Sequence, residues 1–507
     1  MTEKEILARI EKMNEQHDHS YSEIMDFIEN LPEAEKTPPV LCELARAYNN
    51  VAVCEDTDEI NTELLKDSVD ILESIENEFP ENDHLLNYRM GYALFYLDHV
   101  GEALERFKKA LIGKPHDENT EQFIKWCMDK IALPMYEKNF AQRIEDGWKK
   151  FAAGESELRR LISEKAHSDD ITDLCSELLC DTFTNVCFEV GFNGEKYDLI
   201  LSPEKDKQVL YLFSEFKRRA PESVLKHWNI LLGRQAVRSD KFELGFHGKR
   251  LGLSDVTVRI ERNDDGCKIV GYGEQLAKML ADDENEAFWF FDLLLDMTLG
   301  EVVNMRYIDT IDLEPKPFEG ISLLKLPEKI KELFGKNENW DSAEGFLESG
   351  VGYEMKPREF AEDEYPTPRL DAFFGFACIP NFVNDYLNGR YEAFNKADND
   401  GVAAGFIFFP VHVFEDDETS KRGEKILSFR DDLERYITEK AGESFVFIGG
   451  ASGYDNCYLD FLAWDLKPVL DAAAEFFAAQ NTVPWAFYQS FRDDVKVLAL
   501  METGDRE

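Results

Sequence analysis

The residues best suited to chemistry by type and spacing form a glycine-rich stretch near the carboxyl end of the chain. Gly449-Gly450-Ala451-Ser452-Gly453 stands between two apolar runs, and Asp455 and Asp460 follow closely. A backbone with so few side chains can approach a phosphate group, but phosphate-binding loops open a helix and usually carry a lysine. Ser452 also lacks the G-x-S-x-G frame of a hydrolase nucleophile. We interpret the stretch as a flexible hairpin tip, and a small-ligand or enzymatic C-terminal domain that uses this turn with both aspartates stays open as an alternative.

The histidines and cysteines do not form the spacing of a metal site. His17-Asp18-His19, and His412 with Glu415, each fall short of three convergent ligands. The nine cysteines are odd in number, contain no C-x-x-C pair and lie mostly inside apolar runs. This pattern favours buried reduced thiols over a disulfide framework. We therefore expect no metal, no cofactor and no catalytic constellation.

The elements that would position functional side chains are most explicit between His84 and Pro115. Gly91 stands where two helices must approach closely, and Pro115 ends the second helix. Small or apolar residues precede Pro115 and Pro80 at the same offsets of 12, 8 and 5 positions. They are Ala103, Phe107 and Ala110 before Pro115, and Ser68, Leu72 and Ile75 before Pro80. A weaker third copy ends at Pro32. The spacing predicts stacked helical pairs in which small residues let the helices touch.

This pattern resembles the tetratricopeptide repeat (TPR), a helix–turn–helix unit of about 34 residues. The resemblance covers roughly residues 20–150. It implies a groove that is lined by the first helix of each pair and binds a peptide or protein. The lysine-and-asparagine clamp that chaperone-binding TPRs use for acidic tails is not reproduced. The residues that the resemblance carries to the groove are Arg46, Asn49, Asn50, Tyr88, Arg89, Tyr92, Phe95 and Tyr96. Intramolecular packing of these aromatic residues against the following domain is the open alternative.

From about Ser156 the pattern changes to helices segregated from hairpins, which predicts α+β domains with mainly antiparallel sheets. Hairpins are expected at residues 186–204, 255–273 and 445–465. Residues 222–233 and 370–387 are interpreted as helices, and residues 401–414 as a pair of strands. The predicted fold class is multidomain, with N-terminal all-α TPR-like repeats followed by two α+β domains. The predicted boundaries are 1–150, 151–315 and 316–507.

The two later sections share an order of hairpin, helix and tryptophan segment. Trp228 follows the helix in the first section, and Trp485 follows it in the second. Tyr197-Asp198-Leu199 would correspond to Leu459-Asp460-Phe461. The last section is therefore a candidate divergent duplicate of the middle one, and we expect both tryptophans to complete a core.

The charge of the chain restricts its partners. It contains 102 acidic and 57 basic residues, a formal net charge of −45. Nucleic acid and anionic lipid would repel such a surface. The longest apolar run, residues 401–414, is shorter than the roughly 20 residues of a membrane span, and the N-terminus lacks the apolar core of a signal peptide. These features predict a cytoplasmic protein with no nucleic-acid or membrane partner.

The sequence as a whole predicts a non-enzymatic protein-interaction or scaffold protein whose TPR-like groove binds a peptide or protein partner. The acidity is explained most simply by solubility, and a basic partner, whose association opposite charges would accelerate, stays open as an alternative. Two alternatives stay open. One is an acidic immunity-type protein that neutralises a basic toxin, and the other is the small-ligand or enzymatic C-terminal domain.

Overall fold

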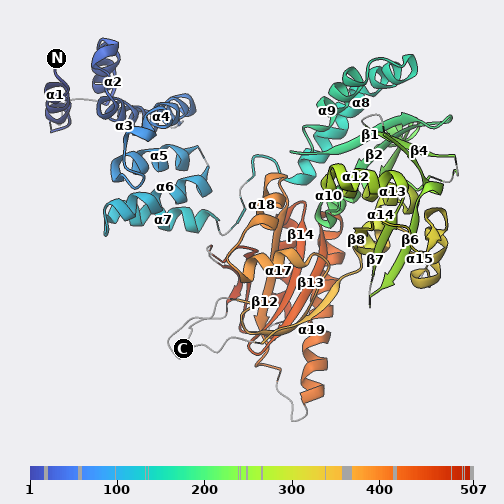
Figure 1. Ribbon diagram of the computed structural model, residues 1–507. Coiled ribbons are helices and arrows are strands. Elements are labelled where there is room, and N and C mark those ends of the chain that lie inside the picture. Colours follow the sequence, from blue (N-terminus) through green and yellow to red (C-terminus); the bar gives the residue numbers. More distant parts are fainter. Residues whose placement is uncertain are drawn as a thin grey trace. The chain divides into compact units, whose positions relative to one another are not determined.

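The structure is a computed structural model of the 507-residue chain. It describes residues 1–15, 21–54, 60–97, 99–131, 133–134, 136–237, 239, 241–246, 249–263, 266–336, 338–356, 368–414, 419–480, 482–493, 495 and 497–502. The chain divides into two compact units (Figure 1). The first unit is Met1–Glu137 with Asp494–Leu498, and the second is Lys138–Asp493 with Ala499–Glu507. The multidomain prediction is therefore confirmed, and His17-Asp18-His19 lies outside the described residues.

The first unit is built from helices that follow one another along the chain. Side-chain caps begin two of them, because Asn61 and Asp83 accept hydrogen bonds from the backbone N–H groups of Leu64 and Leu86. The helices are α1 (Glu3–Glu15), α2 (Tyr21–Glu29), α3 (Pro38–Cys54), α4 (Thr62–Ile75), α5 (His84–Tyr96), α6 (Val100–Gly113) and α7 (Glu118–Ile131). The predicted helical N-terminal region is thus confirmed.

Small residues bring neighbouring helices of the first unit together. A Cβ on Gly91 of α5 would lie 3.0 Å from the ring of Phe107 on α6. Phe107 in turn stacks on Phe123 of α7, with ring centroids 4.9 Å apart. Between α3 and α4, the Ser68 hydroxyl donates to the carbonyl oxygen of Ala45. The expected small-against-large contacts are present, whereas the resemblance to TPR itself stays a prediction.

The second unit opens with two helices and a small three-stranded sheet. The elements are α8 (Phe140–Glu164), α9 (Ser168–Leu179), β1 (Cys187–Phe192), β2 (Tyr197–Ser202), α10 (Lys207–Arg218), α11 (Glu222–Leu225) and β3 (Trp228–Leu232). The strands lie in the order β1-β2-β3, with β2 and β3 parallel. The helix expected over residues 222–233 is wrong in its second half, because Trp228, Ile230 and Leu232 alternate with less buried residues at the period of a strand.

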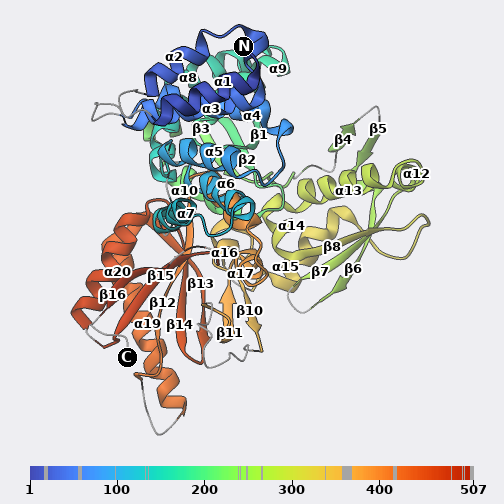
Figure 2. The ribbon, with the colours of Figure 1, turned by 90° about the vertical axis from the view of Figure 1, so that its left-hand side faces the viewer.

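The middle of the second unit holds a four-stranded sheet of order β8-β7-β6-β9 and a two-stranded ribbon, β4-β5. Helix α13 packs beside β8 (Figure 2). Residues 255–273 form the expected hairpin, β6 with β7. The elements are β4 (Glu243–Phe246), β5 (Lys249–Gly252), β6 (Thr257–Arg262), β7 (Cys267–Tyr272), α12 (Glu274–Asp282), α13 (Glu284–Leu299), α14 (Glu301–Tyr307), β8 (Ile308–Leu313), β9 (Ile321–Ser322), α15 (Leu326–Phe334) and α16 (Ala343–Leu347).

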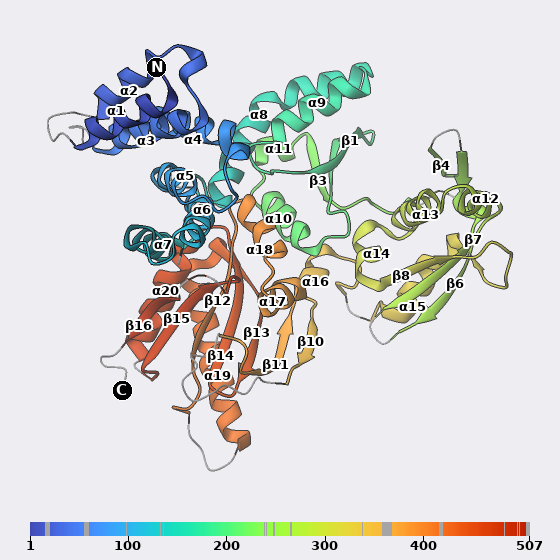
Figure 3. The ribbon, with the colours of Figure 1, turned by 60° about the vertical axis from the view of Figure 1, so that its left-hand side comes forward.

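The C-terminal part forms a seven-stranded sheet of order β10-β11-β13-β14-β12-β15-β16 (Figure 3). Its strands are β10 (Val351–Glu354), β11 (Ala372–Ala377), β12 (Ala403–Pro410), β13 (Phe445–Gly453), β14 (Asn456–Ala463), β15 (Trp485–Ser490) and β16 (Leu498–Glu502). Its helices are α17 (Pro380–Leu387), α18 (Glu392–Asn399), α19 (Thr419–Ala441) and α20 (Leu466–Gln480). Antiparallel pairs dominate the sheets, as predicted, with parallel pairs at β2–β3 and β7–β8.

Helices cover both faces of this sheet. On one face Phe406 of β12 meets Tyr386 of α17. On the other, Phe409 meets Phe429 of α19 and Phe477 of α20. All eight residues of β12 are buried, because a central strand covered on both faces has no polar side. The strand pair expected over residues 401–414 is wrong for this reason, since a single strand accounts for the apolar run.

The helix expected over residues 370–387 is also wrong in its first half. Ala372–Ala377 form β11, and a helix begins only at Pro380. Proline suits the first turn of a helix and pushes the preceding residue towards extended backbone. Both later sections do contain the order hairpin, helix and strand. In the first the last strand lies beside β2, whereas in the second β12 intervenes between β14 and β15. Descent by duplication stays a prediction.

Candidate functional site

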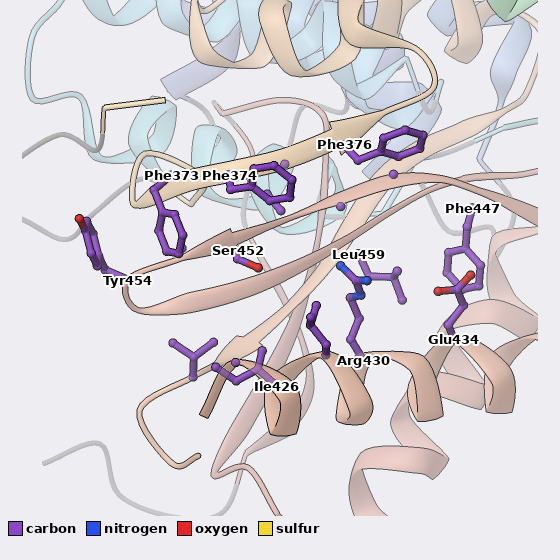
Figure 4. A pocket seen from close by; sticks show the side chains of 18 of the residues that line it. Phe373, Phe374, Phe376, Ile426, Arg430, Glu434, Phe447, Ser452, Tyr454 and Leu459 are labelled. Carbon is purple, nitrogen blue, oxygen red and sulfur yellow. The ribbon is translucent and has the colours of Figure 1, made fainter. Parts of the chain in front are cut away.

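An apolar cleft lies on the face of the C-terminal sheet that carries α19 (Figure 4). We call it the α19 cleft; its volume is about 890 Å³, within the range typical of small-molecule sites. Strands β11, β13 and β14 form one side and α19 forms the other. The residues that line it include Glu348, Phe373, Phe374, Phe376, Arg422, Gly423, Ile426, Leu427, Arg430, Glu434, Phe447, Gly449, Gly450, Ser452, Tyr454 and Leu459.

The floor of the cleft is a trough along β13. Residues directly opposite one another in an antiparallel sheet point to the same face. Phe376, Gly450 and Leu459 form one such row, and Phe374 faces Ser452 in another. The smallest side chains therefore lie between larger ones, so the sheet surface is hollow along β13. The Gly449–Gly453 stretch is part of this strand, and its interpretation as a hairpin tip is wrong; the tip itself is Tyr454-Asp455.

A bulge in β13 shapes this trough. The pairing of β13 with β14 shifts between Phe447 and Gly449. Gly449 has φ of +149°, and a Cβ there would lie 2.2 Å from the carbonyl oxygen of Phe376. Only glycine fits such a backbone with so close a neighbour. The glycine content of the stretch thus serves strand geometry and not a phosphate loop.

Aromatic side chains form the exposed wall of the cleft. Phe373, Phe374, Phe376 and Tyr454 are 40%, 50%, 41% and 66% exposed, and Leu427 on α19 is 43% exposed. Figure 4 shows Phe373 and Tyr454 close together at one end, where their ring centroids are 5.3 Å apart. A contiguous exposed apolar surface of this kind marks binding sites in folded proteins.

Polar groups enter the cleft from α19. Arg430 points from the helix towards the sheet, and Glu434 lies beyond it next to Phe447 (Figure 4). The Nε atoms of Arg422 and Arg430 are buried and have no hydrogen-bond partner within the described part of the chain. Burial raises the pKa of the Glu434 carboxyl above its ordinary value, and the charge of Arg430 opposes that shift. The cleft therefore combines an apolar wall with a guanidinium group that retains bonding capacity.

Three of the predicted groove residues hold helices of the first unit together. Asn49, Arg89 and Phe95 are 3%, 6% and 7% exposed. Arg89 on α5 donates to Glu43 and to the sulfur of Cys42 on α3, and the Asn49 amide donates to the carbonyl oxygen of Arg89. Substitution of Arg89 would therefore weaken the packing of α5 against α3, whether or not a partner binds there.

The other predicted groove residues are partly exposed. Asn50 donates to the carbonyl oxygen of Arg46 within α3. Tyr88 and Tyr92 contact Phe123 of α7 edge-on, and Tyr92 also lies 4.8 Å from Tyr96 between ring centroids. Burial raises the pKa of Tyr88 to about 12. The aromatic residues therefore form a cluster with α7, which includes Trp126, 43% exposed.

The two aspartates of the alternative C-terminal site do not line the α19 cleft. Asp460 is 1% exposed and forms a salt bridge with buried Arg369, which also donates to the Tyr353 hydroxyl. Asp455 lies in the β13–β14 turn, where its backbone N–H donates to Asp371. Asp460 therefore neutralises a buried cation, and neither aspartate of this alternative is placed to contact a ligand in the α19 cleft.

The two tryptophans belong to the core of the second unit, as expected. Trp228 is fully buried and its indole N–H donates to Glu155 at 3.0 Å. Trp485 is partly buried and packs against the same core. Neither lines the cleft.

Among the described residues, no group of three histidine, cysteine or acidic side chains is arranged to hold a metal ion. No helix in the described ranges is both long and apolar enough to span a bilayer. Comparison with known proteins gives no match to a family model, a curated protein or a solved structure.

Sequence reasoning missed the wall of the cleft. The segment Ala372–Ala377 reads AFFGFA, in which Phe374 and Phe376 are two positions apart. That spacing is typical of one face of a strand. The spacing of Phe374 and Phe376 thus indicates a strand. The helical pattern of residues 380–387 immediately downstream led to the prediction of a helix over the whole segment.

Proposed function

We propose that the protein acts by binding, and that the α19 cleft is its principal ligand site. The observation that carries this proposal is the set of exposed Phe373, Phe374 and Phe376 side chains beside a hollow strand. Leaving three phenylalanine rings half in water forfeits about 1 kcal/mol or more for each ring, by the usual value per unit of apolar area. A ligand that covers them recovers this free energy.

A neutral solvatochromic dye such as Nile red tests the cleft without involving charge. Phe374→Asp combined with Leu427→Asp places two carboxylates at its walls, and both positions are exposed enough to tolerate the change. We expect the dye fluorescence of the wild type to be largely lost in this variant. Phe192→Asp is the matched control, since Phe192 is 55% exposed on β1, away from the cleft. Equal fluorescence in all three proteins would contradict the proposal.

A second candidate function is the binding of a protein or peptide partner by the helices of the first unit. Trp126 on α7 is 43% exposed and contacts Phe95 and Phe123, beside partly exposed Tyr92 and Tyr96. Tryptophan and tyrosine are enriched at interaction hot spots. The acidity of the chain favours a basic partner, and such association would weaken with added salt.

Cross-linking in a cell extract tests this second function. Proteins cross-linked to the wild type through this surface should be lost with Trp126→Ala. Ile112→Ala is the matched control, because Ile112 is 64% exposed on α6, a second helix of a pair. The same set of partners with both variants would count against the helical surface.

A further inference from the structure

The charge of the α19 cleft narrows the class of its ligand. Two arginines, Arg422 and Arg430, and two glutamates, Glu348 and Glu434, line the cleft, whereas the whole chain has 102 acidic and 57 basic residues. The cleft is therefore much less acidic than the chain that contains it. This contrast favours an anionic group in the ligand.

Arg430 is the cation best placed to meet such a group. Its nearest acidic oxygen in a described ion pair belongs to Asp431, the next residue on the helix, at 3.6 Å, and that carboxylate is 63% exposed. An exposed pair of this kind contributes little. Arg422 already donates one N–H to the carbonyl oxygen of Val411. The Nε of Arg430 is buried without a partner in the described residues, so its guanidinium can donate two hydrogen bonds to one carboxylate.

Glu434, the cleft acid four residues after Arg430 on α19, does not cancel this cation. Burial raises the pKa of Glu434 and thereby favours its neutral form, although Arg430 opposes the shift. No ion pair within 4.0 Å joins Glu434 and Arg430 among the described residues. A ligand head group near Arg430 would therefore contact the guanidinium. The trough along β13 extends from Arg430 towards Phe373 and Tyr454 (Figure 4).

The position of the trough disfavours an extended peptide. Strands β11, β13 and β14 each have a strand partner on both sides. The floor of the cleft thus offers side chains, and its backbone N–H and C=O groups are already used in the sheet. A peptide laid along it would leave its own backbone groups unpaired against phenylalanine rings, which costs free energy. A ligand with an apolar body and a single polar head has no such cost.

We propose that the α19 cleft binds a small amphiphile with an elongated apolar body and one carboxylate head group. The head lies on Arg430, and the body lies in the trough over Gly450 and Ser452 against Phe374 and Phe376. This inference rests on the proposed function of the cleft and adds to it the class of ligand.

Calorimetric titration of the full chain with three probes that share a ten-carbon chain tests the head group. The probes are decanoate, decan-1-ol and decyltrimethylammonium, each below its micelle concentration. We expect decanoate to bind most tightly. Arg430→Gln should weaken decanoate about tenfold or more and leave decanol unchanged, because only the charged head uses the guanidinium. Arg430→Lys, which retains the charge, should recover part of the affinity.

The matched control is Arg435→Gln on the same helix. Arg435 is 64% exposed, pairs with Asp432 and does not line the cleft, so this variant should bind all three probes as the wild type does. Equal affinity for decanoate and decanol, unchanged by Arg430→Gln, would overturn the carboxylate assignment and leave the apolar site intact. Tighter binding of the cationic probe would also overturn it. Failure of all three probes to bind would overturn the cleft function together with this inference.

Discussion

At the scale of single residues, the carboxyl group of Asp296 shows how burial shapes the chemistry of the second unit. Asp296 lies near the end of α13, and its side chain is 5% exposed. It accepts a hydrogen bond from the Asn304 amide at 2.7 Å and lies 3.4 Å from the ammonium of Lys205. Burial raises its pKa to about 6, against the opposing effects of Lys205 and Asn304. The ionised form is therefore disfavoured in the folded protein.

This shift predicts a loss of stability with rising pH. An acid whose pKa is higher in the folded than in the unfolded state contributes stability at pH values below its ordinary pKa, which is 3.8 for Asp296. This contribution is lost as the pH rises through about 6. Two pKa units correspond to about 2.7 kcal/mol. Asp296→Asn removes the titration and keeps an oxygen for Asn304. Urea unfolding of the second unit should therefore show the variant gaining about 2–3 kcal/mol relative to the wild type between pH 4 and pH 7.

Asp292→Asn is the control for simple removal of charge. The Asp292 carboxylate also pairs with Lys205, at 3.0 Å, but its side chain is 32% exposed. The difference in the free energy of unfolding between Asp292→Asn and the wild type should change less across the same pH range. A constant difference between Asp296→Asn and the wild type would show that Asp296 does not titrate as inferred.

At the scale of elements, strand β13 determines the shape of the cleft. Its bulge at Gly449 and its small residues Gly450 and Ser452 leave the sheet surface hollow. Helix α19 borders this hollow with Leu427 and Arg430. The site thus depends on the conformation of one strand more than on any single reactive group.

Two glycine substitutions separate strand geometry from general effects. Gly449→Ala adds a methyl group 2.2 Å from a carbonyl oxygen at a φ of +149°. We expect it to lower the free energy of unfolding of the second unit by about 1–3 kcal/mol and to weaken dye binding. A Cβ at Gly423 of α19 would have no atom within 4 Å. Because alanine also favours a helix, Gly423→Ala should raise the free energy of unfolding by about 0.5–1 kcal/mol. Urea unfolding measures both, and equal effects would refute the role of the bulge.

Local patterns in the sequence predicted part of this arrangement. The hairpins β1–β2, β6–β7 and β13–β14 follow from runs of strand-forming residues around short turns. Segments buried on both faces, such as β12, have no alternation and were misinterpreted. The cleft could not be predicted, because it requires β11 to pair with β13, about 75 residues later in the chain, and such pairing is not encoded in local periodicity.

At the scale of the whole molecule, each of the two units has hydrophobic clusters built from its own elements. Phe107 belongs to a cluster whose buried members come from α3 to α7. The main cluster of the second unit contains residues from α8 onward. Units with separate cores can unfold separately.

Calorimetry of Phe107→Ala tests this independence. Phe107 is fully buried against Gly91 and Phe123, so its truncation should cost about 3–5 kcal/mol. We expect one thermal transition to move to lower temperature while a second stays in place. Ile112→Ala on the same helix, at an exposed position, should move neither. A single transition that shifts as a whole would show that the two cores are coupled.

The strand order of the C-terminal sheet also has a consequence for synthesis on the ribosome. Strand β11 pairs with β13, and β12 pairs with β14 and β15, all of which leave the ribosome later. Until they emerge, the phenylalanines of β11 and β12 have no sheet to enter. The nascent chain therefore carries its most apolar strands uncovered for an interval set by translation, and such intermediates are prone to aggregate. A requirement for chaperones should accordingly arise late in synthesis, between completion of β12 and completion of β15.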